Sequence, residues 1–225
     1  MKTIQSWSPP PEKPVLPRSG ELHLWLIDLD IQTVNLERYL SPDEHDRAQR
    51  MLRAEGSRRF VAARACMRKI LADYLATDAG LINFRYGSAG KPEIVHPGSD
   101  LRFNLSHSGH LALLALTHQS EIGVDMEPLK QQPNLLAISR KIFGAEVQKT
   151  LAAMDEPRQK VRFFQLWTEL EARAKCKGSG VFSQTDDTIP AVNFAPETGW
   201  IAAVASSRGI PQILEWLTYR LIPSD

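Results

Sequence analysis

Two carboxylates stand two residues apart in a short apolar segment, IGVDME at residues 122–127. Side chains alternate along a strand, so Asp125 and Glu127 are predicted to point to the same face. Two like charges on a buried strand repel each other and are costly to desolvate. A divalent cation would remove both problems, and all-oxygen ligands favour Mg²⁺, Mn²⁺ or Ca²⁺ over zinc. The alternative is a strand that runs out into solvent with two surface acids, because a DxE pattern alone is common.

A strongly helical segment, residues 157–178, carries the next candidates. Trp167, Glu171 and Lys175 are four residues apart and share one stripe of the helix. An adjoining apolar stripe is predicted to face the core; it contains Phe163, Leu166, Leu170 and Ala174. The alternative for Glu171 and Lys175 is an exposed ion pair worth a few tenths of a kcal/mol.

A polar segment, FNLSHSG at residues 103–109, joins two apolar runs and is predicted to be a loop. Its serines and Gly109 favour a turn that allows close approach of a ligand. Ser106 and His107 could present a hydroxyl and an imidazole to an anion. A serine hydrolase is not indicated, because the GxSxG nucleophile motif is absent from the chain.

The predicted elements repeat in order along the chain. Residues 1–20 are Pro-rich and are expected to form an extended surface strap. Strand, helix and strand are then predicted twice, first at 21–29, 57–76 and 111–116, and again at 122–126, 157–178 and 200–205. Further helices are expected at 42–55 and 145–155. This order predicts two α+β halves, residues 21–118 and 119–225, with a site at their junction.

Composition narrows the class of protein. The chain has 225 residues, 43% of them hydrophobic, with a net charge of +1. A dedicated nucleic-acid binder usually shows a strong basic excess, so nucleic acid is not an expected partner. No apolar stretch is long enough to span a bilayer, and no secretory signal is apparent. Cys66 and Cys176 lack disulfide or zinc spacing, which favours a reducing, cytoplasmic location.

Taken together, these segments resemble the Sfp-type 4′-phosphopantetheinyl transferases. FNLSHSGHLALLAL, IGVDMEPL and FFQLWTELEARAKCKGSG are similar to the three signature regions of that family, in the same order. AGKPEI and RRFVAARACMRKILADYL are similar to its GKP segment and N-terminal helix. The resemblance implies a pseudo-two-fold α+β monomer that binds coenzyme A between its halves. It also implies transfer of the phosphopantetheine arm to a serine of an acidic acyl or peptidyl carrier protein.

The resemblance also implies roles for individual residues. It implies that Mg²⁺, with Mn²⁺ possible, is held by Asp125, Glu127 and Glu171. Glu171 would accept the proton of the carrier serine, and Lys175 would stabilise the leaving phosphate. The coenzyme's phosphates and adenosine end would be contacted by a further set, which contains Arg47, Arg59, Arg64, Lys91, Ser106, His107 and Lys175.

One residue departs from the family pattern. The signature has a lysine before the metal-binding glutamate, where this chain has Leu170. The missing positive charge leaves open a module that binds coenzyme A or a carrier without catalysis. A metal-dependent pyrophosphohydrolase is a further alternative, although the glutamate-rich Nudix helix is absent from the sequence. Candidates to dock the acidic carrier lie in the second half, namely Arg140, Lys141, Lys149 and Lys160. The alternative is that these residues form an ordinary solvated face.

Overall fold

The computed structural model describes residues 2–30, 35–180 and 187–222. The fold is α+β, as predicted. Its strands are β1 (Lys2–Thr3), β2 (His23–Asp28), β3 (Asn83–Tyr86), β4 (Pro92–Val95), β5 (Leu101–Ser108), β6 (Leu111–His118), β7 (Ile122–Pro128), β8 (Ala191–Ala195), β9 (Trp200–Ser206) and β10 (Leu217–Leu221). Its α-helices are α1 (Pro42–Gln49), α2 (Ala54–Leu75), α3 (Leu135–Phe143), α4 (Ala145–Ala152) and α5 (Glu156–Lys177). Three short 3₁₀ helices are η1 (Leu36–Tyr39), η2 (Ala79–Leu81) and η3 (Ile213–Glu215).

The same β-α-β-β order occurs twice. In the first half the order is β2, α2, β5 and β6, with α1 inserted before α2 and the β3–β4 hairpin after it. In the second half the order is β7, α5, β8 and β9, with α3 and α4 inserted before α5. The last strand of each unit is central in its sheet, since the strand orders are β10-β2-β6-β5 and β1-β8-β9-β7. We call these the N-terminal and C-terminal sheets. The repeated order predicted from the sequence is therefore present in the topology.

The two sheets pack against each other, and one long helix covers the outer face of each. The inner core joins Leu24 and Leu113 of the N-terminal sheet to Val124 and Val204 of the C-terminal sheet. The outer face of β2 and β6 packs on α2, and the outer face of β9 packs on α5. Because β6 is covered on both faces, its sequence LALLALTH is apolar almost throughout rather than alternating.

The ends of the chain cross between the halves. β1 pairs in parallel with β8 of the C-terminal sheet, while β10 pairs in parallel with β2 of the N-terminal sheet. Between them, Ser8 bridges to Tyr219, and the Trp7 indole donates a hydrogen bond to the Pro196 carbonyl. The Pro-rich strap therefore ties both sheets together.

Two predicted elements differ in extent or type. The helix expected at 42–55 ends at Gln49, because the chain turns back there and the Ser57 hydroxyl donates to the Ala48 carbonyl. The loop expected at 103–109 is mostly strand, because β5 pairs with β6 along its whole length and only Gly109 and His110 form the turn. Helix α3 and strands β3, β4, β8 and β10 were not predicted.

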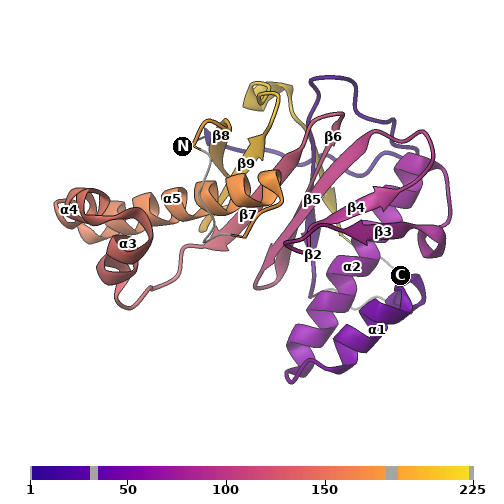
Figure 1. The fold of residues 1–225 in the computed structure, drawn as a ribbon, viewed down its shortest axis with the longest axis horizontal. Coiled ribbons are helices and arrows are strands. Elements are labelled where there is room, and N and C mark those ends of the chain that lie inside the picture. The colour runs from indigo at the N-terminus through magenta and orange to yellow at the C-terminus, as the bar shows by residue number, and fades with distance from the viewer. Residues whose placement is uncertain (1, 31–34, 181–186, 223–225) are drawn as a thin grey trace.

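Helices α3 and α4 and the first part of α5 project from one side of the molecule, away from α1 and α2 (Figure 1). They are held by a separate apolar cluster that includes Leu151, Phe163 and Ile201. None of the helices in the described part of the chain combines the length and apolarity needed to cross a bilayer.

Candidate active site

Strands β5 and β7 are the edge strands of the two sheets and face each other. Within the described structure they are not paired by backbone hydrogen bonds, and side chains of β5 bind to β7 instead. The Asn104 amide oxygen accepts the Val124 N–H at 2.9 Å. The Ser106 hydroxyl donates to Asp125 at 2.9 Å, and the Ser108 hydroxyl donates to Glu127 at 2.8 Å. The two carboxylates thus lie on one face, as predicted, and they stand where the halves meet. Figure 1 shows β5 and β7 side by side near the centre of the molecule.

Gly123 determines how closely α5 approaches this seam. A Cβ placed on Gly123 would lie 2.0 Å from the Ala172 carbonyl oxygen and 2.3 Å from the Cys176 backbone nitrogen. The helix backbone therefore rests directly on β7. Since Gly123, Asp125 and Glu127 alternate along the strand, the same face that receives the helix carries the acids. This contact brings the last turns of α5 to the carboxylates.

The α5 residues Glu171 and Lys175 meet Asp125 at this contact. The Lys175 ammonium lies 2.6 Å from Asp125 Oδ1 and 3.1 Å from the Ser106 hydroxyl. Burial raises the pKa of Asp125 above its ordinary value, although Lys175 and Ser106 oppose the rise. Burial, followed by the negative charge of Asp125, also raises the pKa of Glu171. The three carboxylates form a site with an excess of negative charge.

This excess of charge bears on whether a cation fits the site. Asp125 Oδ2 is buried and has no hydrogen-bond partner in the described structure, so its lone pairs are free to bind a cation. An all-oxygen donor set of this kind suits a hard divalent cation. Within the described residues, however, no three His, Cys, Asp or Glu side chains are gathered as a ready-made metal site. The donor chemistry fits a cation, and the side chains are not arranged as a closed cage.

His107 lies next to Ser106 on β5 and faces the other way, on the side of Leu105 and α2. Partial burial lowers the pKa of His107, and the positive charges of Lys175 and Arg47 lower it further. The Arg47 guanidinium also stacks over the Phe60 ring, 5.1 Å from the ring centroid. His107 therefore lies within the electrostatic influence of two positive charges, which favour an anion nearby.

Arg64 and Arg59 are engaged elsewhere. Arg64 and Arg68 both bind the carboxylate of Glu44, which is only 2% exposed. Burial raises the pKa of Glu44, but the two guanidinium groups and the Ser41 N–H outweigh it and hold that pKa below its ordinary value. Arg59 makes a bidentate pair with Asp30, at 2.7 and 2.8 Å. Both arginines have carboxylate partners already, so neither is an open anion ligand in this structure.

Lys91 is also fully engaged. Its ammonium donates to Glu121 at 2.7 Å and to the backbone carbonyls of Ile122 and Cys176 at 3.0 and 3.1 Å. The side chain is 9% exposed. The ammonium thus joins the beginning of β7 to the end of α5, a role that its GKP motif did not suggest.

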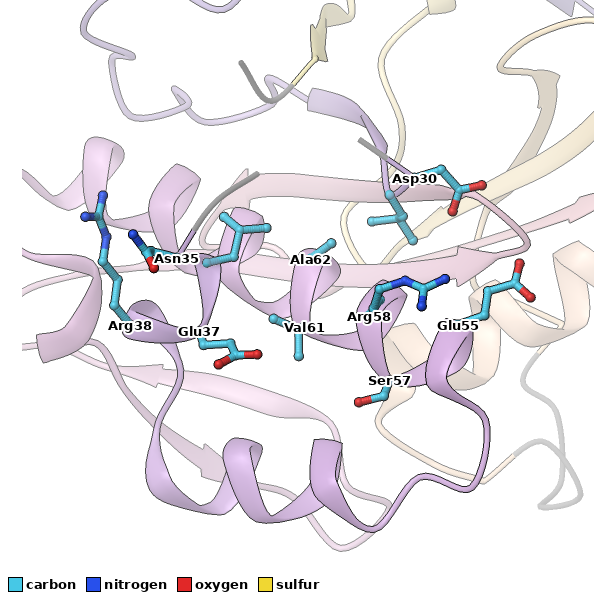
Figure 2. Close-up of a pocket in the computed structure, with 11 residues that line it drawn as sticks. Asp30, Asn35, Glu37, Arg38, Glu55, Ser57, Arg58, Val61 and Ala62 are labelled. Carbon is cyan, nitrogen blue, oxygen red and sulfur yellow. The ribbon is translucent and has the colours of Figure 1, made fainter. Parts of the chain in front are cut away.

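A cavity of about 1140 Å³ lies between η1, the beginning of α2 and the end of β2. Figure 2 shows Asp30 and Glu55 at one side of it and Glu37 and Arg38 at the other, with Val61 and Ala62 between. Asp30 and Glu55 are the partners of Arg59. None of the predicted site residues is among its described lining, so this cavity is separate from the seam.

Comparison with known proteins decides the family. Residues 30–119 match the sequence model described as "4′-phosphopantetheinyl transferase, N-terminal". Residues 121–205 match that of the "4′-phosphopantetheinyl transferase superfamily". The chain belongs to the 4′-phosphopantetheinyl transferase superfamily. The two matched regions meet at the connection between β6 and β7, where the second β-α-β-β unit begins.

Named relatives agree with this assignment. The chain is 40% identical over 182 residues to the 4′-phosphopantetheinyl transferase HetI of Nostoc sp., covering 78% of this chain and 76% of the relative. It is 31% identical to a putative 4′-phosphopantetheinyl transferase of Synechocystis sp., over 76% of this chain and 71% of the relative. It is 29% identical to the transferase Sfp of Bacillus subtilis, over 64% and 62%.

The position that departs from the transferase signature lies beside the seam. Leu170 directly precedes Glu171 and is half-buried, as is Leu166. The prediction that both leucines belong to the core stripe is wrong, because α5 turns Phe164, Thr168, Ala172 and Cys176 toward the sheet instead. Phe163 and Ala174 of that stripe are buried as predicted. Leu170 is therefore partly accessible to solvent, one residue before Glu171.

Sequence reasoning missed Asn104, Ser108 and Gly123. Asn104 lies two residues before Ser106 and Ser108 two residues after it, a strand pattern that was hidden when the segment was taken as a loop. Gly123 lies inside an apolar strand, where a glycine indicates close approach of another backbone. Both signals are present in the sequence and could have located these residues.

Proposed function

We propose that this transferase moves the 4′-phosphopantetheine arm of coenzyme A to a serine of an apo acyl or peptidyl carrier protein, and releases adenosine 3′,5′-bisphosphate. The observation that carries the proposal is the convergence of Asp125, Glu127, Glu171 and Lys175 on the β5–β7 seam. We place coenzyme A at this seam, between residues 21–118 and 119–225.

In the proposed reaction the serine hydroxyl attacks the β-phosphorus of the coenzyme. A serine O–P bond forms, and the bond between that phosphorus and the bridging oxygen of the pyrophosphate breaks. Glu171 accepts the serine proton, because a carboxylate at the reacting centre can act as a general base. Lys175 stabilises the negative charge that develops on the leaving bisphosphate.

We propose that Asp125, Glu127 and Glu171 hold Mg²⁺, or Mn²⁺ in its place. When bound, the cation would neutralise negative charge on the pyrophosphate oxygens. Ser106 and Ser108 orient the first two carboxylates through their hydroxyl groups. The buried, unpartnered Oδ2 of Asp125 supports this assignment.

We assign the remaining basic groups to the coenzyme's phosphates. Arg47 and His107, with Ser106 beside them, are proposed to bind the 3′-phosphate end, and their electrostatic coupling supports this. Arg59 and Arg64 would have to leave Asp30 and Glu44 to reach a phosphate. A contribution from either to binding therefore requires rearrangement.

The proposed second substrate is an acidic carrier protein, which we expect to meet a basic surface. Arg140 and Lys141 on α3 and Lys149 on α4 are exposed, while Lys160 on α5 is half-buried. Lys149 is paired with Glu146 at 2.8 Å. The helices that carry these residues, α3, α4 and the first part of α5, project from one side of the molecule (Figure 1). We further propose that the enzyme acts as a monomer in the cytoplasm.

The test is to incubate the purified protein with coenzyme A, Mg²⁺ and an apo carrier protein, and to measure the intact mass of the carrier. A gain equal to one phosphopantetheine arm, lost when EDTA is added, is the expected result. Hydrolysis of coenzyme A without a carrier would instead indicate a pyrophosphohydrolase. If the protein binds coenzyme A but the mass of several different carriers does not increase, a non-catalytic binding module would be favoured. Leu170, which replaces the lysine of the family signature, is the observation that supports this alternative.

A further inference from the structure

Lys91 connects the first half of the chain to the end of α5. It lies just before β4, in a hairpin where the Gly87 N–H donates to the Lys91 carbonyl. From there its ammonium reaches the Cys176 carbonyl in the last turn of α5 and the Ile122 carbonyl at the beginning of β7. A single buried charge therefore spans three segments that lie 30 and more residues apart in the sequence.

The end of α5 is chemically suited to this contact. The last carbonyls of a helix lack partners within the helix and carry partial negative charge. Gly178, at φ 70°, ends the helix and donates to the carbonyls of Ala174 and Lys175. The Cys176 carbonyl receives Lys91 instead, which supplies both a hydrogen bond and a positive charge. The lysine stem packs against Gly178 at the same point.

Glu121 holds the ammonium in place. Its carboxylate binds Lys91 at 2.7 Å through one oxygen and Arg102 at 3.0 Å through the other. The Cys176 thiol donates to the Glu121 backbone carbonyl at 3.3 Å. Glu121 thus contacts the end of α5 both directly and through Lys91, and it is itself none of the proposed ligands of metal or coenzyme.

We propose that Lys91 is a positioning residue that clamps the last turn of α5 onto β7, and so fixes Lys175 and Glu171 opposite Asp125. This inference rests on the transfer reaction proposed above. An ammonium has three donors, and here each has a protein acceptor, so a phosphate could bind Lys91 only by displacing one of them. The clamp therefore replaces the role of phosphate ligand that the GKP motif implies.

Steady-state kinetics separate the two roles. In the clamp role, Lys91→Met lowers kcat about 10- to 100-fold through misplacement of Glu171 and Lys175, with little change in KM or Kd for coenzyme A. Glu121→Gln is expected to lower kcat in the same way, with little change in KM. The kcat of the double variant is expected to be no lower than that of Lys91→Met alone. A rise in Kd for coenzyme A in Lys91→Met, with a normal Glu121→Gln enzyme, would overturn the clamp.

A matched control uses the other partner of Glu121. Arg102→Met removes the second ion pair of the same carboxylate but no contact with α5, so kcat is expected to stay within about twofold of wild type. An Arg102→Met enzyme as impaired as Glu121→Gln would show that Glu121 acts through Arg102, which contradicts the proposal.

Hydrogen exchange tests the clamp without any assay of transfer. Amides in the last turn of α5, residues 174–178, are expected to exchange faster in both Lys91→Met and Glu121→Gln, while those of α2 are unchanged. Unchanged exchange at 174–178 would overturn the clamp even if the enzyme is active. Faster exchange in a protein that transfers nothing to any carrier would uphold the clamp and reject the proposed reaction.

Discussion

The ammonium of Lys175 lies 2.6 Å from Asp125 Oδ1, a contact that joins the end of α5 to β7. Asp125 is 5% exposed and is near both Glu127 and Glu171, so Lys175 offsets part of a concentrated negative charge. If Asp125 held the proposed cation, Lys175 would be available to contact the phosphates of the coenzyme. The Asp125–Lys175 pair thus links the proposed metal ligands to the proposed phosphate-binding lysine.

Asp125→Asn is expected to reduce transfer by more than about 100-fold, because it removes one charge from the proposed metal ligands while preserving side-chain shape. The melting temperature of wild type should rise with Mg²⁺ and coenzyme A together, and that of the variant should not. Ser106→Ala is the control, since it removes a hydrogen bond to the same carboxylate but no charge. Wild-type turnover and a normal Mg²⁺ response in Asp125→Asn would refute the metal assignment.

Gly123→Ala tests how closely α5 must approach β7. The new methyl group would meet backbone atoms of Ala172 and Cys176, which cannot move without shifting the helix. We expect a loss of about 3 kcal/mol or more in the free energy of unfolding, measured by urea denaturation, together with a large fall in kcat. A stable variant with normal activity would show that the contact does not position the site.

Gly56→Ala is the matched control for this substitution. Gly56 lies in the first turn of α2, and its nearest neighbours to an added Cβ are side-chain atoms at 3.7 and 3.9 Å. The free energy of unfolding is expected to stay equal or to rise by up to about 1 kcal/mol, because alanine favours the helix.

The strongly patterned parts of the fold were predictable from sequence. Leu22, Leu24 and Leu26 alternate with Trp25 and Ile27, and the structure buries the first set between the sheets and the second under α2. Strands β8 and β10 were not predicted, because both are short and only partly buried. The partner of β10 is β2, which is also distant in sequence. Local pattern carries no record of such long-range pairing.

The types of side chain in the candidate site were predicted from the sequence, but their contacts were predicted only in part. The carboxylates of Asp125 and Glu127 follow from strand alternation, and Glu171 and Lys175 follow from helical spacing. That Arg64 is bound to Glu44 could not be read from sequence, because the ion pair joins residues 20 positions apart on two helices. Charge type can be read locally, whereas the partner of a charge depends on the tertiary fold.

His23 predicts a specific pH dependence of stability. Its Nδ1 lies 2.7 Å from the Tyr74 hydroxyl, which also accepts the Trp25 indole N–H at 3.2 Å. The Tyr74 proton is therefore directed at Nδ1. Nε2 is buried without a hydrogen-bond partner in the described structure, with Glu21 at 3.6 Å and the Tyr219 ring nearby. Burial lowers the pKa of His23 below 6.5, and Glu21 only partly opposes it.

A histidine whose pKa is lower in the folded state binds its proton more readily when unfolded. The free energy of unfolding is therefore expected to fall as the pH drops below about 6.5, by at most ~1.4 kcal/mol per pH unit from this residue. His23→Gln should show a smaller fall than wild type between pH 7.5 and 5.5 in urea denaturation. Equal falls in the two proteins would show that His23 does not contribute.

Leu170→Lys restores the positive charge that the family signature places before the metal-binding glutamate. Because Leu170 is half-buried and outside the hydrophobic clusters of α5, the substitution should change the free energy of unfolding by no more than about 0.5 kcal/mol. A lysine here would add a cation near the proposed pyrophosphate site, so KM for coenzyme A is expected to fall several-fold at low salt, less at high salt. Leu170→Gln is the control for polarity without charge. If both variants behave like wild type, position 170 lies outside the field of the coenzyme's phosphates.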